Sequence, residues 1–87
     1  MAGSGLAPIR MLLTEKDVRK AIRSAAPQFD VDSLAAGRNF LSAGLDSLDH
    51  AMILLRLYER HGLNVPDEDV MQCSSIHGIL EYASKHP

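Results

Sequence analysis

The chain has few cysteine and aromatic residues, which often stabilise small proteins through disulfides, metal sites or large buried rings. Its 87 residues include one cysteine, no tryptophan and only four other aromatic side chains. The lone Cys73 excludes an internal disulfide, and no spacing of cysteine and histidine suits zinc, so we expect no metal site. No run approaches the roughly 20 apolar residues of a membrane span. Helix packing must therefore stabilise the fold, whose core is modest at this length. Because the lone cysteine forms no internal disulfide, we expect a reducing, cytoplasmic setting.

The net charge of the chain is close to zero, but the acidic and basic residues are unevenly distributed along it. Residues 1–45 carry six Lys and Arg against four acidic residues, whereas residues 46–87 carry three against seven. Because nucleic-acid binding requires a basic surface, we expect no nucleic-acid partner.

The first 13 residues do not resemble a targeting signal. Pro8 and Arg10 interrupt the apolar run, and no small-residue cleavage site follows a continuous hydrophobic stretch. We therefore expect residues 1–13 to be a flexible leader and residues 14–87 to form one domain.

Apolar residues recur at helical spacing in the folded part of the chain. Thr14 is a typical N-cap for a first helix, which Pro27 ends. A second helix is predicted from Ser47 to His61, closed by Gly62. A short third helix of little more than one turn should follow Pro66. A fourth should start at Ser74 or Ser75.

The pattern predicts an all-α fold, a small four-helix bundle with a long loop between helices one and two and a short third helix. We expect the loop, residues 28–46, to be pinned to the core by five apolar side chains: Phe29, Val31, Leu34, Phe40 and Leu41. An ordered loop of this length is uncommon in a small domain unless it has a function.

The most informative motif is GLDSLD, residues 44–49, which opens the second predicted helix. Asp46 and Asp49 can form a capping box, which would make Ser47 an ordinary first-turn residue. Alternatively, Ser47 carries a phosphodiester. The unpaired N–H groups and the positive end of the helix dipole would then stabilise the negative charge.

The surrounding sequence favours the second interpretation. Residues 40–48 (FLSAGLDSL), 65–69 (VPDED), 74–76 (SSI) and 80–82 (LEY) occur in this order. Over about residues 14–84 the chain resembles acyl carrier proteins, the phosphopantetheine-binding carriers. This resemblance implies that a phosphopantetheinyl transferase attaches 4′-phosphopantetheine from coenzyme A to Ser47. It also implies a carrier, not an enzyme, that holds acyl intermediates as thioesters for fatty-acid, polyketide or related specialised biosynthesis.

The resemblance also implies a recognition surface at the start of the second helix, formed by Asp46, Leu48, Asp49, Met52, Leu55 and Arg56. Leu48, Met52 and Leu55 share a face that either packs under the long loop or stays exposed to dock partners. Met52 and Tyr58 occupy positions where family members often have glutamate, so recognition should depend less on charge. We expect a monomer whose partners include acyl-loading and condensing enzymes.

An apolar cargo would be sheltered, according to the resemblance, by five side chains: Leu54, Leu57, Val70, Cys73 and Ile76. Cys73 itself is expected to be a small buried hydrophobe. His50 and His61 are expected at the helix surface or boundary, without a catalytic role.

Two other functions stay open from the sequence. An aminoacyl or peptidyl carrier of a non-ribosomal pathway would use the same arm, and a helical adaptor would bind partners without a prosthetic group. A hydrolase is not expected, since Ser47 lacks the Gly-x-Ser-x-Gly context of a nucleophile elbow.

Overall fold

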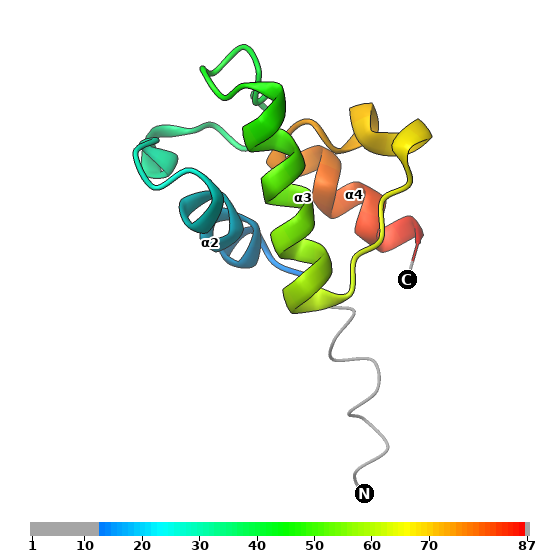
Figure 1. The fold of residues 1–87 in the computed structure, drawn as a ribbon. Helices are drawn as coiled ribbons and strands as arrows, with labels where there is room; N and C mark the ends of the chain where they lie inside the picture. The colour runs from blue at the N-terminus through cyan, green and yellow to red at the C-terminus, as the bar shows by residue number, and fades with distance from the viewer. Residues whose placement is uncertain (1–12, 87) are drawn as a thin grey trace, which may run out of the picture.

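The computed structural model describes residues 13–86, which form three α-helices and two 3-10 helices. The elements are α2 (Glu15–Ala25), η2 (Val31–Ser33), α3 (Ser47–His61), η3 (Asp67–Cys73) and α4 (Ile76–Lys85). In the view of Figure 1, α3 passes across the middle. α2 packs against both α3 and α4, and η3 packs against α4. The predicted all-α bundle with a long first loop and a short third helix is confirmed.

The predicted leader falls mainly on residues 1–12, which lie outside the described residues. Leu13, which we included in the leader, is half-buried and packs against the core. In residues 13–86 no helix is long and apolar enough to cross a membrane.

Helix ends follow the capping residues that the sequence supplies. The Thr14 hydroxyl accepts from the Asp17 N–H at 3.2 Å, and the Asp17 carboxylate accepts from the Thr14 N–H at 3.0 Å. Gly62 ends α3 in the left-handed conformation at φ 72°, which costs glycine no steric penalty. Ser75 caps α4 through the Gly78 N–H at 2.9 Å. The predicted bounds of α3 are confirmed.

The core lies where α2, α3 and α4 meet. Each helix contributes its inward apolar positions, and the long loop adds more side chains to the same cluster. The fully buried side chains are Val18, Ala21, Ile22, Phe40, Ile53, Leu57, Cys73, Ile76 and Ile79. Burial of this continuous apolar cluster is the main stabilising contribution in a chain whose single cysteine cannot form an internal disulfide.

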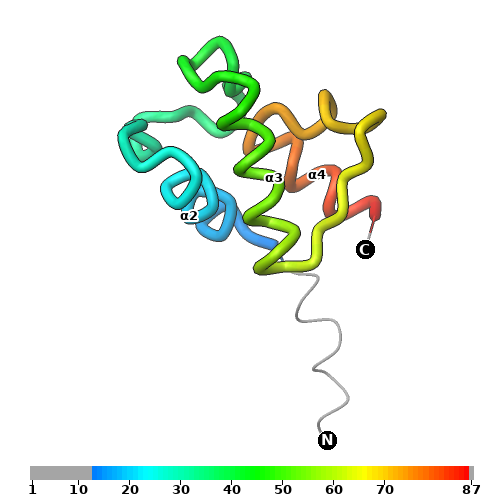
Figure 2. Tube along the Cα trace, viewed as in Figure 1, coloured from blue at the N-terminus to red at the C-terminus, as the bar shows by residue number. Residues whose placement is uncertain are grey.

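The long loop leaves α2, crosses the bundle and returns to the start of α3, as the tube in Figure 2 shows. Arg19 of α2 holds its first half, since the guanidinium donates to the carbonyls of Val31 and Leu34 at 2.7 and 2.9 Å. Further along, the Phe40 N–H donates to the Ser74 carbonyl and the His77 N–H donates to the Ala36 carbonyl, at 2.8 and 2.9 Å.

The loop anchors are Val31, Leu34 and Phe40, with Phe29 half-buried, but the prediction for Leu41 was wrong. The N–H groups of Ala43 and Leu45 both donate to the Phe40 carbonyl, at 3.1 and 3.0 Å. This turn leaves Leu41 42% exposed and places Leu45, only 3% exposed, in the core.

The third helix is longer than predicted. η3 spans seven residues, which at three residues per 3-10 turn is more than two turns. Its end lies so close to α4 that a Cβ on Gly78 would collide with the Gln72 carbonyl. The Tyr82 hydroxyl of α4 also donates to the Asp69 carboxylate at 2.7 Å. These two contacts with α4 explain why the segment stays helical up to Cys73.

Phe40 should contribute far more stability than its neighbour Leu41. Phe40→Ala removes a fully buried ring, so the free energy of unfolding should fall by about 3–5 kcal/mol. Leu41→Ala, the matched control on the exposed side of the turn, should cost no more than about 0.5 kcal/mol. Urea unfolding followed by circular dichroism measures both values, and equal losses would contradict the described turn.

Candidate functional site

Ser47 is the first residue of α3 and lies at its positive end. The left-handed Gly44 at φ 111° and the buried Leu45 direct the chain into the helix. The Asp46 carboxylate accepts from the Asp49 N–H at 2.8 Å, and the Asp49 carboxylate accepts from the Asp46 N–H at 3.1 Å. The predicted capping box is therefore present, and it is built entirely from aspartates.

The capping box leaves the Ser47 hydroxyl uncommitted. Ser47 is exposed, and within residues 13–86 its hydroxyl makes no hydrogen bond. The N–H groups of Ser47 and Leu48 also have no partner there, because the box uses those of Asp46 and Asp49. Two free donors and the helix dipole thus surround an accessible hydroxyl, which suits a phosphate group bonded to it.

A cleft of about 440 Å³ extends from Ser47 along α3. One wall is formed by α3 and the other by residues 63–71. Of the five predicted cargo residues, Leu54 and Val70 line it, whereas Leu57, Cys73 and Ile76 are fully buried elsewhere in the core. Several other side chains that line the cleft were not predicted from the sequence to contact a cargo: Leu41, Tyr58, Leu63, Val65 and Met71.

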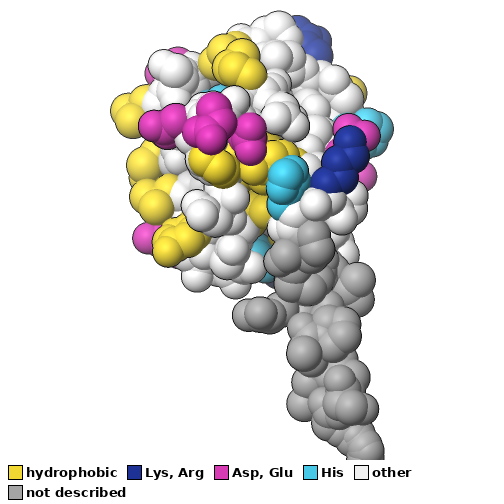
Figure 3. Space-filling model, turned by 90° about the vertical axis from the view of Figure 1, so that its right-hand side faces the viewer, with side chains coloured by type: hydrophobic (Ala, Val, Ile, Leu, Met, Phe, Trp, Pro, Cys, Tyr) yellow, Lys and Arg dark blue, Asp and Glu magenta, His cyan; other side chains and the backbone are white. Residues whose placement is uncertain are grey.

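The face formed by η3 and α4 combines acidic and hydrophobic side chains (Figure 3). The acidic group comes from the first turn of η3, where Asp67, Glu68 and Asp69 are consecutive. Met71, among the most exposed large hydrophobic side chains, belongs to the same helix and lines the cleft.

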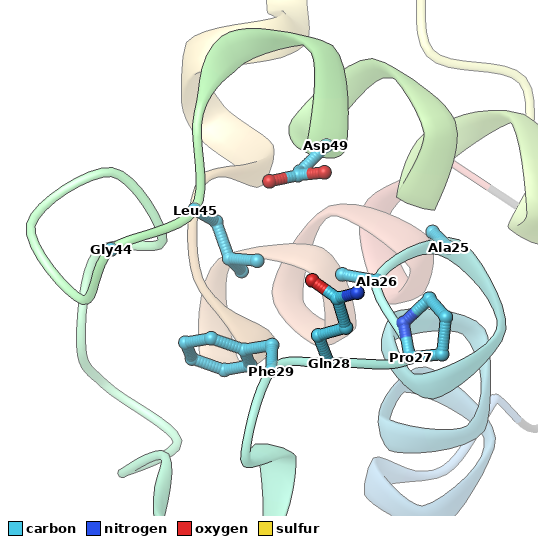
Figure 4. Close-up of a pocket in the computed structure, with 8 residues that line it drawn as sticks. All are labelled: Ala25, Ala26, Pro27, Gln28, Phe29, Gly44, Leu45 and Asp49. Carbon is cyan, nitrogen blue, oxygen red and sulfur yellow. The ribbon is translucent and has the colours of Figure 1, made fainter.

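A second hollow, also of about 440 Å³, lies on the α2 side of α3. Figure 4 shows the Asp49 carboxylate on one side of it, across from Gln28 and Phe29 in the segment that follows α2. The same carboxylate caps α3, so its position is fixed by the helix start.

The predicted recognition residues differ in how free their side chains are. Leu48 is 68% exposed and Leu55 42% exposed, whereas Met52 is half-buried. Arg56 is engaged within the protein, since its guanidinium donates to the Ser24 hydroxyl and to Glu59, both at 3.2 Å. Two exposed leucines thus lie close to the exposed Asp46 and Ser47, and the recognition role of these residues stays a prediction.

His50 was wrongly expected at the helix surface or boundary. It is only 4% exposed, and its ring packs edge-on against Phe40 with centroids 5.6 Å apart. The ring nitrogen Nε2 lies 2.8 Å from the Cys73 carbonyl oxygen. The sequence held no signal for this contact because the two residues are 23 positions apart.

Burial controls the chemistry of the cysteine beside the cleft. Loss of solvation, and to a smaller extent the Asp69 carboxylate, raises the pKa of the Cys73 thiol to about 11. The hydrogen bond to Asp69 raises the pKa of Tyr82 to about 12, so this bond between η3 and α4 persists at neutral pH. Among residues 13–86, no cluster of three or more His, Cys, Asp or Glu could hold a metal ion.

The chain matches known families over most of its length. A family model described as the phosphopantetheine attachment site matches residues 16–83. A relative named "Acyl carrier protein, mitochondrial" from Dictyostelium discoideum is 31% identical over 78 residues, which cover 86% of the chain. The chain spans 65% of the length of that relative, which is just under two thirds.

The Cys73 thiol should resist alkylation in the folded protein. At pH 8 a thiol with a pKa of about 11 is almost entirely protonated, and the thiolate is the reactive form. Iodoacetamide should therefore leave the native protein without a mass increase and add one group after denaturation in urea. Fast stoichiometric labelling of the native protein would show that Cys73 is accessible.

Proposed function

Because the chain belongs to the family of phosphopantetheine-binding carrier proteins, we propose that it carries acyl intermediates as thioesters on an arm attached to Ser47. The family resemblance stated from the sequence is confirmed, and with it 4′-phosphopantetheine as the cofactor and a carrier in place of an enzyme. The uncommitted, exposed hydroxyl at the start of α3 is the observation that carries the assignment to Ser47.

The residues around Ser47 fit the arm that the family implies. The free N–H groups of Ser47 and Leu48 would stabilise the negative charge of the phosphodiester, while Asp46 and Asp49 keep the helix start intact. When bound, the arm supplies a terminal thiol that forms the thioester. The protein supplies the tether, which raises the effective concentration of the cargo at each partner enzyme.

The cleft beside Ser47 supports an acyl cargo over an aminoacyl one. Leu54, Leu55 and Val70 give its walls a mainly apolar character, which shelters hydrocarbon. Asp67 is the one acidic residue among those that line it, and it is exposed. Leu57, Cys73 and Ile76 lie in the closed core. We propose that these three contact only a longer chain, after α3 and η3 have moved apart.

We further propose that the cargo belongs to fatty-acid, polyketide or related specialised biosynthesis. The partners would be a phosphopantetheinyl transferase followed by acyl-loading and condensing enzymes, which would meet a monomeric carrier. The Dictyostelium relative is named as mitochondrial, and the cytoplasmic setting of this chain stays a prediction.

Loading of Ser47 is tested by intact mass. After incubation with coenzyme A and a promiscuous phosphopantetheinyl transferase, the wild-type protein should gain the mass of one phosphopantetheine group, and Ser47→Ala should gain none. Ser42→Ala, which changes another exposed serine five residues away, should load as the wild type does.

The outcome also separates the carrier from an adaptor without a prosthetic group. If the wild type gains no mass, or if Ser47→Ala loads equally well, the carrier function at Ser47 is excluded. Loading by an adenylating enzyme with an amino acid, in place of an acyl group, would indicate a peptidyl carrier.

Leu48 should be the main apolar contact with the transferase. Leu48→Glu replaces the most exposed leucine of α3 with a charge that would have to be desolvated in a complex. We expect kcat/KM for loading to fall at least about tenfold, because central apolar contacts dominate small interfaces. Tyr58→Ala is the matched control, since Tyr58 is 56% exposed on the same helix but about 15 Å further along its axis. Equal effects of the two substitutions would argue against a surface centred on Leu48.

A further inference from the structure

His50 brings a polar group into the wall of an otherwise mainly apolar cleft. It follows Ser47 by three positions, so the two residues share a face of α3. Both line the cleft. The other polar side chains that line it, those of Ser47, Tyr58, Asn64 and Asp67, belong to exposed residues, whereas His50 is buried. The end of the cleft nearest the attachment site is therefore the end with an internal polar group.

The contacts of His50 fix which ring nitrogen is available. A carbonyl oxygen only accepts hydrogen bonds, so Nε2 carries a proton and donates to Cys73 over 2.8 Å. In the neutral ring Nδ1 is then an acceptor. The edge-on packing against Phe40 holds the ring in this orientation.

Nδ1 has no hydrogen-bond partner within residues 13–86. In the same part of the chain, no fully buried side-chain nitrogen or oxygen lacks a partner. It follows that Nδ1 is not sealed inside the core, and the cleft is the space that the ring lines. Nδ1 is therefore the ring nitrogen left to bond a group in the cleft that the ring lines.

We propose that Nδ1 of His50 accepts a hydrogen bond from the group tethered to Ser47 and so positions it along the cleft. The donor is a hydroxyl or an amide N–H, which the arm itself or a hydroxylated acyl chain could supply. This inference rests on the proposed attachment at Ser47. A donor on the cargo makes the cleft selective for hydroxylated chains over saturated ones, whereas a donor on the arm positions every cargo alike.

Nitrogen NMR of the histidine rings tests the proposal on the wild-type protein. Four samples are compared: the unmodified protein, the protein with the arm alone, and the protein loaded with either a saturated or a 3-hydroxyacyl group. We expect the unmodified protein to show the tautomer protonated at Nε2. The Nδ1 resonance should then shift on modification, while the exposed His77 and His86 rings stay unchanged.

The samples distinguish the two sources of the donor. A shift with the arm alone assigns the donor to the arm, and a shift only with the 3-hydroxyacyl group assigns it to the cargo. If the arm is present on Ser47 by mass and Nδ1 shifts in no sample, this inference fails while the carrier function stands. If no arm can be attached, both fail.

Two substitutions add a functional measurement. His50→Gln keeps an N–H for the Cys73 carbonyl and an acceptor oxygen for the tethered group, whereas His50→Leu fills similar space with neither. Loss of one hydrogen bond should raise the rate of 3-hydroxyacyl thioester hydrolysis about two- to tenfold in His50→Leu. His50→Gln should stay near the wild type. In His50→Leu the saturated thioester should hydrolyse at an unchanged rate where the NMR places the donor on the cargo, and faster where it places the donor on the arm. Equal acceleration in His50→Gln and His50→Leu would indicate a merely structural role and overturn the proposal.

Discussion

The carbonyl groups of Cys73 and Ser74, at the end of η3, fix the place where α3 begins. The first accepts from the His50 ring and the second from the Phe40 N–H, each at 2.8 Å. A buried polar group that loses its partner costs about 1–3 kcal/mol. A shift of the long loop or of the first turn of α3 would strain one of these bonds, so the position of Ser47 depends on residues remote in sequence.

The serine at this site is free because other residues perform the capping. Serine is itself a favoured N-cap, and a serine hydroxyl in that role would be occupied by a backbone N–H. Here Asp46 occupies the cap and Asp49 completes the box, which moves Ser47 to the next position with its hydroxyl uncommitted. The same two aspartates leave the N–H groups of Ser47 and Leu48 unpaired. The helix start is therefore capped, while the Ser47 hydroxyl stays exposed.

Local signals predicted the parts of this fold that local interactions determine. Thr14, Gly62 and Ser75 marked helix ends correctly, because a cap depends on neighbours within three or four residues. Leu41 and Leu45 belong to one turn, and their spacing gave no reason to prefer either as the buried residue. The choice depends on how the turn closes on the Phe40 carbonyl.

The site could be predicted only in part for the same reason. The motif indicated Ser47, and the family resemblance named Leu54 as a cargo residue, which the structure places beside the cleft. His50 depends on a carbonyl from η3, and the walls formed by Leu63, Val65 and Met71 depend on how residues 63–71 cross α3. Contacts between segments that are distant in the chain do not change the spacing of apolar residues in either segment. The sequence pattern therefore does not reveal them.

We propose that partners recognise this carrier through the side chains of α3 that make no polar contact within residues 13–86. Arg56 is bound to Ser24 and Glu59, and the carboxylates of Asp46 and Asp49 accept from each other's N–H groups. These charges can still steer an encounter at long range, but a direct contact with them would have to replace bonds that already exist. Leu48 is exposed and has no such bond to lose. A small apolar contact of this kind dissociates quickly, which a carrier needs because it has to leave each enzyme before it meets the next.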